Sequence, residues 1–306
     1  MFLSVIGATA IVFSLSRMTG DPLYLYATSG YGLSAEQEAA LRKELRLDRP
    51  LVVQYVVWLG RVAKGDFGRT LLDKRKVVDV IGDKIGNSAQ LGLAAWVFAV
   101  GVGVPLGVLS AVRRASAWDY LARIFALLGT ATPGFWIGLM LIYLFAVTLG
   151  WLPSGTKYGY DTFPLSWNNI RHFILPALVL GWGPAAGFLR ITRSAMLEIL
   201  DSEFIKFARS KGVASRTIIW RHAFRNALIP PLTLIALTMA GFITGTVVVE
   251  QVFSWPGLGS TAVTATFNND FPLMTGIVLI FVVLFALANL LADVAYAYID
   301  PRIKYS

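Results

Sequence analysis

The residues that could carry out chemistry in this chain are few, and their spacing fits no common catalytic site. The 306-residue chain has no cysteine, and its two histidines, His172 and His222, lie far apart in the sequence. Thiolate metal sites, disulfides and the HExxH zinc motif are therefore excluded. The phosphate-binding string GxxxxGK[ST] and the nucleophile motif GxSxG are also missing. We expect no catalytic, cofactor or metal site here, and if ATP drives this protein, another chain must bind the ATP.

The most informative segment runs from Glu203 to Pro231. Apolar residues recur at helical spacing in its first part, with basic residues between them. The apolar residues are Phe204, Phe207 and Ala208, and the basic ones are Lys206, Arg209 and Lys211. Gly212 then predicts a helix end with positive φ, and a second helix should begin near Ser215. Such a helix could lie on anionic lipid or dock its apolar ridge in a partner's groove, and the periodicity fits both uses.

The elements that position this segment are apolar stretches long enough to cross a bilayer. The chain is 56% hydrophobic and only 15% charged, whereas soluble domains average roughly 45–50% and 25%. A span needs about 20 apolar residues. Five uncharged stretches meet this need, and residues 1–16 resemble the second part of a sixth span whose start is missing. The five are residues 89–112, 124–149, 173–189, 227–249 and 273–291.

Basic residues are concentrated in the connections on one side of the predicted spans. They are dense in residues 113–123, 190–225 and 301–306, whereas residues 250–272 have no Lys or Arg. The positive-inside rule places both termini in the cytoplasm, and it explains the net charge of +9 without a nucleic-acid partner. The predicted organisation is a first span (1–17), an outer helical segment (18–88), a five-helix core (89–300) and a tail. The core includes a cytoplasmic loop at 201–226.

The outer segment is predicted to be structured. Ser34 and Gln37 have the spacing of a capping box, and Pro50 is suited to open a further helix. Prolines inside the predicted spans, such as Pro133, are expected to break or open those helices. Four pairs of glycines at small-xxx-small spacing suggest close helix packing. These pairs are Gly103/Gly107, Gly134/Gly138, Gly183/Gly187 and Gly241/Gly245.

Several motifs along nearly the whole chain resemble one transporter family. ARSKG at 208–212 and RHAFRNALIP at 221–230 are similar to the EAA loop of ABC-importer permeases of the dipeptide/oligopeptide/nickel family, of the B type. Lys206 and Phe207 replace the Glu and Ala of the generic EAA pattern, and the closing proline comes later, as in the peptide-importer subgroup. Further matching motifs, in order, are GDP at 20–22, LDRP at 47–50, GDFG at 65–68, WPGLG at 255–259 and DPR at 300–302. The family's basic N-terminal stretch is missing, which suggests a truncated start.

The resemblance implies an all-α membrane protein of six spans with the type I ABC importer permease fold, in the bacterial cell membrane. It implies a homologous second permease, two ATP-binding subunits (or one fused) and an external substrate-binding protein as partners. Di- or oligopeptides are the expected substrate, with nickel chelates or oligosaccharides as alternatives. The residues that would couple to the ATPase are Glu203, Phe204, Phe207, Ala208, Arg209, Lys211, Gly212, Arg221 and His222.

The outer mouth of the translocation path is expected at the WPGLG turn. A Trp-Pro-Gly turn should expose a rigid aromatic side chain, although it could serve only to join two spans. Glu250, at the end of the fifth span, could face substrate or hold an interface position. The residues expected at this mouth are Glu250, Trp255, Pro256 and Gly257. An ion-coupled transporter, a channel or an intramembrane enzyme is a weaker alternative, because the spans contain no charged residue.

Overall fold

The computed structural model describes residues 2–19, 49–155 and 166–299, together with positions 36, 39 and 42. These residues form helices joined by turns and loops, with one isolated bridge between Arg69 and Lys76. The expected all-α class is confirmed. The predicted capping box at Ser34 and Gln37 and the predicted tail at 301–306 lie outside the described residues. The chain divides into two compact units.

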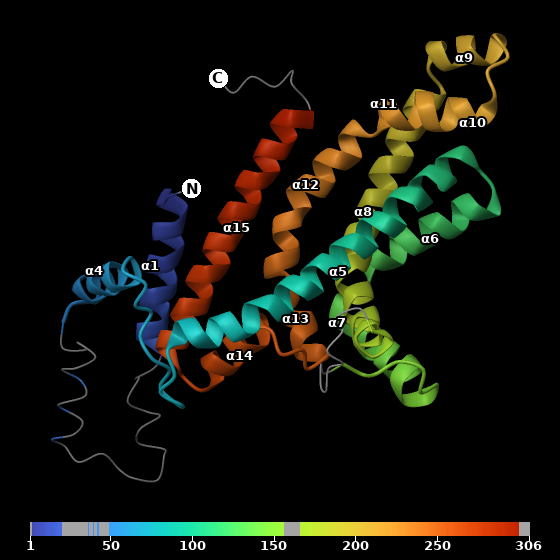
Figure 1. The fold of residues 1–306 in the computed structure, drawn as a ribbon. Coiled ribbons are helices and arrows are strands. Elements are labelled where there is room, and N and C mark those ends of the chain that lie inside the picture. Colours follow the sequence, from blue (N-terminus) through green and yellow to red (C-terminus); the bar gives the residue numbers. More distant parts are fainter. Residues whose placement is uncertain are drawn as a thin grey trace. The chain divides into compact units, whose positions relative to one another are not determined.

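The first unit comprises Met1–Ser88 and Pro256–Ala286. Its helices are α1 (Phe2–Thr19), α4 (Leu51–Val62), the start of α5 (Val77–Val112), α14 (Leu258–Phe267) and the start of α15 (Phe271–Ile299) (Figure 1). The predicted helix after Pro50 is present as α4, and it packs on α1. The hydroxyls of Thr9 and Tyr55 lie 2.9 Å apart. A buried apolar cluster joins α5, α14 and α15 through Val77, Leu258 and Ile277.

The second unit comprises Ala89–Trp255 and Leu287–Ser306, and the long helix α8 (Trp167–Leu200) is its centre. The elements that pack on it include α6 (Ala117–Ala131), α7 (Gly134–Leu141), η2 (Ile218–Phe224), α11 (Arg225–Ala227), α12 (Ile229–Thr244) and α13 (Thr246–Val252). The unit also contains the rest of α5 and α15, η1 (Ile142–Thr148), α9 (Glu203–Ser210) and α10 (Ser215–Thr217). Polar and apolar residues of α8 are both buried along its length.

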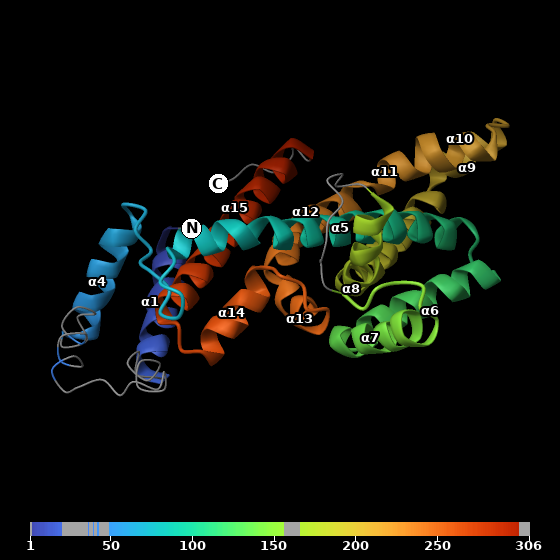
Figure 2. The ribbon, with the colours of Figure 1, turned by 60° about the horizontal axis from the view of Figure 1, so that its bottom comes forward.

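Three helices among the described residues are long and apolar enough to cross a membrane. They are Val77–Val112, Trp167–Leu200 and Phe271–Ala292. The predicted span at 124–149 is instead a bent pair of helices, Ala117–Ala131 and Gly134–Thr148, with an angle of 111° between them (Figure 2). The predicted span at 227–249 is divided where α12 ends at Thr244. The described residues thus contain three of the six expected spans, or four if the bent pair is one span.

The prolines differ in what they do to these helices. Thr132 is extended, with φ −103° and ψ 132°, and Pro133 follows it where α6 ends and α7 begins. Proline disfavours a helical residue before it and has no N–H to donate, so the predicted break is confirmed here. Pro105, Pro176 and Pro184, by contrast, lie inside α5 and α8, which continue past them. These three prolines therefore do not break their helices, because neighbouring helices and side chains can satisfy the freed carbonyls.

One of the four glycine pairs brings two helix backbones into contact at both of its positions. A Cβ on Gly103 would lie 2.5 Å from the carbonyl oxygen of Ala185, and one on Gly107 would lie 2.7 Å from that of Leu189. Nothing lies within 4 Å of a Cβ built on Gly134 or Gly241. Gly103 and Gly107 therefore allow α5 to pack directly against α8, as small residues do between membrane helices.

We expect Gly107→Ala to destabilise the protein by about 1–3 kcal/mol, because the added methyl group forces α5 away from α8. Gly101→Ala is the matched control on the same helix, because a Cβ there meets no atom within 4 Å. Thermal denaturation of the purified protein in detergent measures both variants. Equal midpoints for Gly107→Ala, Gly101→Ala and wild type would contradict the close packing of α5 and α8.

Candidate functional site

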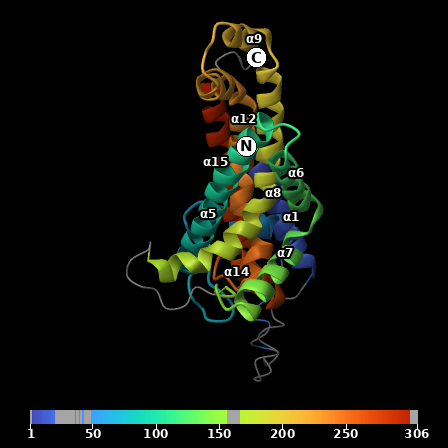
Figure 3. The ribbon, with the colours of Figure 1, turned by 90° about the vertical axis from the view of Figure 1, so that its right-hand side faces the viewer.

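A sharp turn after α8 positions the helix that the sequence singled out. α8 ends at Leu200, and α9 begins at Glu203 after a two-residue connection (Figures 1 and 3). In this connection the hydroxyl of Ser202 donates to the carbonyl of Ile199 at 2.6 Å. Glu203 lies in the first turn, where a negative charge suits the helix dipole. It also pairs with Lys206 at 2.7 Å.

The helix α9 has one buried face and one exposed face. Ile205 is fully buried, whereas the side chains of Phe204 and Phe207 are 44% and 61% exposed. The ammonium of Lys211 lies 4.5 Å from the centre of the Phe207 ring, within the range of a cation–π contact. Arg209 is exposed as well. The exposed face therefore combines aromatic and cationic side chains.

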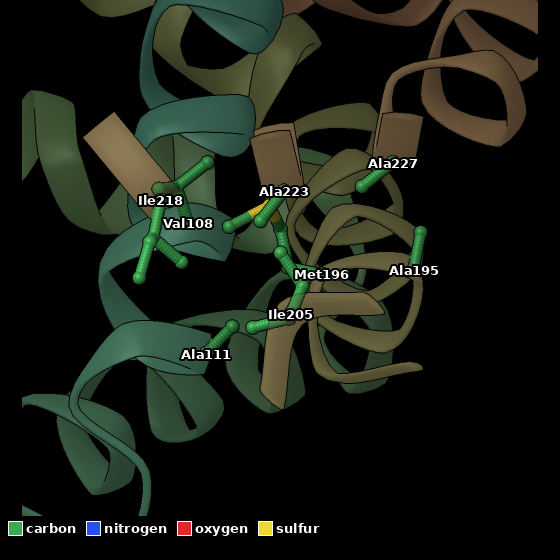
Figure 4. Close-up of a cluster of buried hydrophobic side chains, with 8 residues drawn as sticks. All are labelled: Val108, Ala111, Ala195, Met196, Ile205, Ile218, Ala223 and Ala227. Carbon is green, nitrogen blue, oxygen red and sulfur yellow. The ribbon is translucent and has the colours of Figure 1, made fainter. Parts of the chain in front are cut away.

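Ile205 anchors α9 to a buried apolar cluster. Figure 4 shows its side chain among residues from α5, α8, η2 and α11. The members of this cluster are Val108, Ala111, Ala195, Met196, Ile205, Ile218, Ala223 and Ala227. The sequence interpretation missed Ile205 because it followed the Phe204–Phe207 ridge. The available sequence signal was the i,i+3 spacing of Ile205 and Ala208, which places the two residues on a face of the helix away from Phe207. In the structure Ala208 is half-buried on that face.

Gly212 ends α9 in the predicted left-handed conformation, with φ +74°. The amide of Gly212 donates to the carbonyl of Arg209 at 2.9 Å, and the amide of Val213 donates to that of Ala208 at 3.2 Å. These two bonds form a Schellman motif, which satisfies carbonyls that the helix end leaves open. Val213 also packs against the Ile205 cluster. The chain therefore reverses direction at Gly212 and returns to the same core.

Arg221 and His222 lie on η2, which packs against α9. Arg221 lines an open depression of about 410 Å³ together with Arg216, Thr217 and Trp220. His222 is half-buried, and its carbonyl accepts a hydrogen bond from the Asn226 amide at 2.6 Å. The structure thus places the predicted coupling residues on two neighbouring elements, α9 with its terminal turn and η2.

The residues expected at the outer mouth are divided between the two units. In the second unit, Glu250 and Trp255 are fully buried. The Trp255 ring packs edge-on against Phe173, with ring centres 4.7 Å apart. The expectation that Trp255 is exposed was wrong. Ser254 has φ +48°, and the amide of Trp255 donates back to the Glu250 carbonyl at 2.8 Å, which returns the indole to the core.

In the first unit, Pro256 and Gly257 lead into α14. The amide of Asn87 donates to the carbonyl of Pro256 at 2.9 Å. The backbone amide of Leu258, just after Gly257, donates to the hydroxyl of Ser88 at 2.8 Å. WPGLG is therefore held by hydrogen bonds and core packing, and a role at the outer mouth stays a prediction.

Asp270 was missed by the sequence interpretation. It is buried just before α15, where its carboxylate accepts hydrogen bonds from the amides of Leu71 at 2.9 Å and Leu273 at 3.3 Å. Burial raises the pKa of the Asp270 carboxyl above its ordinary value. An Asp directly before a long apolar run is a helix-start signal that could have found it. It joins the loop around Leu71 to the start of α15 within the first unit.

We expect Gly212→Val to loosen the end of α9, because a β-branched side chain is strained at positive φ by about 1–2 kcal/mol. Trypsin should then cleave after Arg209 and Lys211 about tenfold faster, since cleavage follows local opening. Gly212→Asn is the control, because Asn tolerates the left-handed conformation better than other residues with side chains. If trypsin cleaves the Val and Asn variants at the same rate, the left-handed turn does not hold α9 in place.

Comparisons with known proteins identify the family. Residues 103–305 match the family described as binding-protein-dependent transport system inner membrane component. The oligopeptide transport system permease protein AppB of Bacillus subtilis is 39% identical, over 98% of this chain and 95% of its own length. The dipeptide transport system permease protein DppB of Alkalihalophilus pseudofirmus is 36% identical, over 98% of this chain and 96% of its own length.

A chain of the inward-facing MetNI methionine ABC transporter shares the fold. The TM-score is 0.57 at 17% identity, over 73% of this chain and 97% of that one. The expected ABC importer permease fold and the expected family are thereby confirmed. This chain belongs to the family of binding-protein-dependent transport system inner membrane components.

Proposed function

We propose that this chain is the permease subunit of an ATP-driven peptide importer and that it couples to its ATPase partners through α9. The observation that carries the proposal is the two-sided helix: Ile205 holds α9 on the core, while Phe204 and Phe207 face outward. Exposed aromatic and cationic residues on a rigidly seated element are typical of the centre of a protein interface. The chain would form the translocation path with a homologous second permease.

Peptides are the substrate class that the relatives favour. AppB and DppB are named as oligopeptide and dipeptide permeases, and each aligns with nearly the whole of this chain. Nickel chelates and oligosaccharides are the alternatives that the family resemblance leaves open. An external binding protein would deliver the substrate, and two ATP-binding subunits, or one fused subunit, would bind ATP and Mg²⁺.

A second use of α9 is contact with anionic lipid. A lipid-bound helix separates an apolar face, which enters the membrane, from a polar face, which meets water. In α9 the most apolar position, Ile205, faces the protein core, and Lys211 lies against the exposed Phe207 ring. The exposed face is thus mixed in character, which favours a protein groove over a lipid surface.

We expect Phe207→Asp to prevent association of the ATPase subunits and to abolish uptake, because docking would bury a carboxylate without a partner. Phe207→Leu is the matched control and should retain both, since it keeps an apolar side chain. The measurements are co-purification of the ATPase with the chain and uptake of labelled peptide in the same cells. The chain purified without ATPase subunits serves as the negative control and should hydrolyse no ATP. Full co-purification and uptake by Phe207→Asp would exclude α9 as the coupling helix.

We also propose that both termini, α9 and η2 lie in the cytoplasm and that α14 lies on the outer side. The support is the density of basic residues around α9 and their absence from 250–272. Single cysteines at the exposed positions Ser215 and Thr264 test this in a chain without other cysteines. A membrane-impermeant thiol reagent added to intact spheroplasts should label Thr264→Cys and leave Ser215→Cys unlabelled. The reverse pattern would show that the orientation is inverted.

A further inference from the structure

A buried carboxylate lies where three helical segments of the second unit meet. Asp119, in the first turn of α6, is 1% exposed. It accepts hydrogen bonds from the Ser110 hydroxyl of α5 at 2.6 Å and from the backbone amide of Ala115 at 3.0 Å. Arg193 of α8 donates to both carboxylate oxygens, from Nε at 2.9 Å and from Nη2 at 3.1 Å. We call Ser110, Asp119 and Arg193 the Asp119 clamp.

The geometry of this clamp is more demanding than simple packing requires. A two-pronged guanidinium–carboxylate pair fixes both distance and orientation. A buried ion pair adds little net stability compared with apolar residues of the same volume, but losing one partner leaves a costly buried charge. Arg123 approaches Asp119 only to 3.7 Å with a half-exposed side chain, so it does not replace Arg193. The clamp therefore specifies one arrangement of α5, α6 and α8.

The clamp adjoins the seat of α9 on two of these helices. On α5, Ser110 lies beside Ala111, and on α8, Arg193 is one turn before Met196. Ala111 and Met196 both belong to the buried cluster that holds Ile205. A displacement of α9 would therefore reach α5 and α8, which the clamp ties to α6, as well as η2, which packs directly on α9.

We propose that Ser110, Asp119 and Arg193 are positioning residues that make α5, α6 and α8 move together when the ATPase moves α9. This inference rests on the proposed function of α9. Without the clamp, the ATPase would still dock on the exposed face of α9, which the clamp does not touch. Its movement would then be absorbed between α8 and α6, so ATP would be hydrolysed with little transport.

An exposed ion pair close by provides a matched control. Arg114, in the loop after α5, pairs with Asp201, just after α8, at 3.5 Å, and their side chains are 65% and 70% exposed. Exposed pairs of this kind contribute little. Arg114→Gln thus removes an arginine–aspartate contact from the same region without opening the clamp.

The experiment uses the complete transporter in proteoliposomes, with its ATPases and a peptide-loaded binding protein. Peptide uptake and ATP hydrolysis are measured in the same vesicles for Asp119→Asn, Arg193→Gln, Arg193→Lys and Ser110→Ala. We expect Asp119→Asn and Arg193→Gln to lower peptide transported per ATP about tenfold, within the range for residues along a coupling network. Arg193→Lys, which keeps the charge, should recover part of that loss. Ser110→Ala should have a smaller effect, and Arg114→Gln should match wild type.

The outcomes separate a positioning role from a purely structural one. Should the clamp only stabilise the fold, its variants would reduce the yield of transporter and leave the ratio of uptake to hydrolysis unchanged, which overturns the proposal. If Asp119→Asn cannot be purified, Ser110→Ala and Arg193→Lys decide, because each removes only part of the network. Loss of the ATPase from clamp variants would also overturn it, by assigning the clamp to docking. If the ATPase co-purifies fully with Phe207→Asp, α9 is not the docking helix, and the proposed function is refuted instead.

Discussion

The close contact between α5 and α8 is the constraint on which the second unit depends. Three glycines make it possible, because a Cβ on Gly103, Gly107 or Gly181 would lie 2.5 to 2.7 Å from a carbonyl oxygen of the facing helix. Two apolar helices in lipid gain no hydrophobic energy by leaving lipid for each other, so they rely on close van der Waals packing. Gly103 and Gly107 on α5 and Gly181 on α8 together fix the distance and the register of the two helices. Ser110 and Arg193 can then reach the same carboxylate on α6.

The same contact explains how so short a helix as α9 is held. Eight residues cannot form a stable helix alone, because nucleation costs more than so few hydrogen bonds return. α9 is stabilised by the burial of Ile205, by the Schellman turn at Gly212 and by the return of Val213 to the same cluster. Part of that cluster comes from α5 and α8, which the glycines hold together. Phe204 and Phe207 are consequently free to face outward on a rigid support.

The buried WPGLG tryptophan shows how a turn motif can serve the core. A turn rich in proline and glycine leaves its aromatic residue free to point either way, and the positive φ of Ser254 directs Trp255 inward onto Phe173. In the first unit, Asp270 also holds two distant segments together, since its carboxylate joins a loop to the start of α15. Both sites hold segments that are distant in sequence, so mobility in either region would need these contacts to open.

Composition and short-range spacing were sufficient to predict several features of this protein. Charge-free apolar stretches indicated a membrane protein, Lys211-Gly212 predicted the left-handed end of α9, and the ordered motifs indicated the family. Each of these follows from local chain physics or from many matches together. The break at Pro133 was likewise local, because proline removes a donor and constrains the residue before it.

Which side chains face inward, and which distant groups meet, became clear only from the packing of the helices. Ile205 and Phe207 are both apolar and two positions apart, and only the position of the core shows which of them is the anchor. Pro105 and Pro133 both interrupt apolar stretches, yet only Pro133 ends a helix, since neighbouring elements determine whether the freed carbonyls are satisfied. The pairing of Asp119 with Arg193 joins residues 74 positions apart. No local pattern encodes such a contact, because it exists only once α5, α6 and α8 have packed.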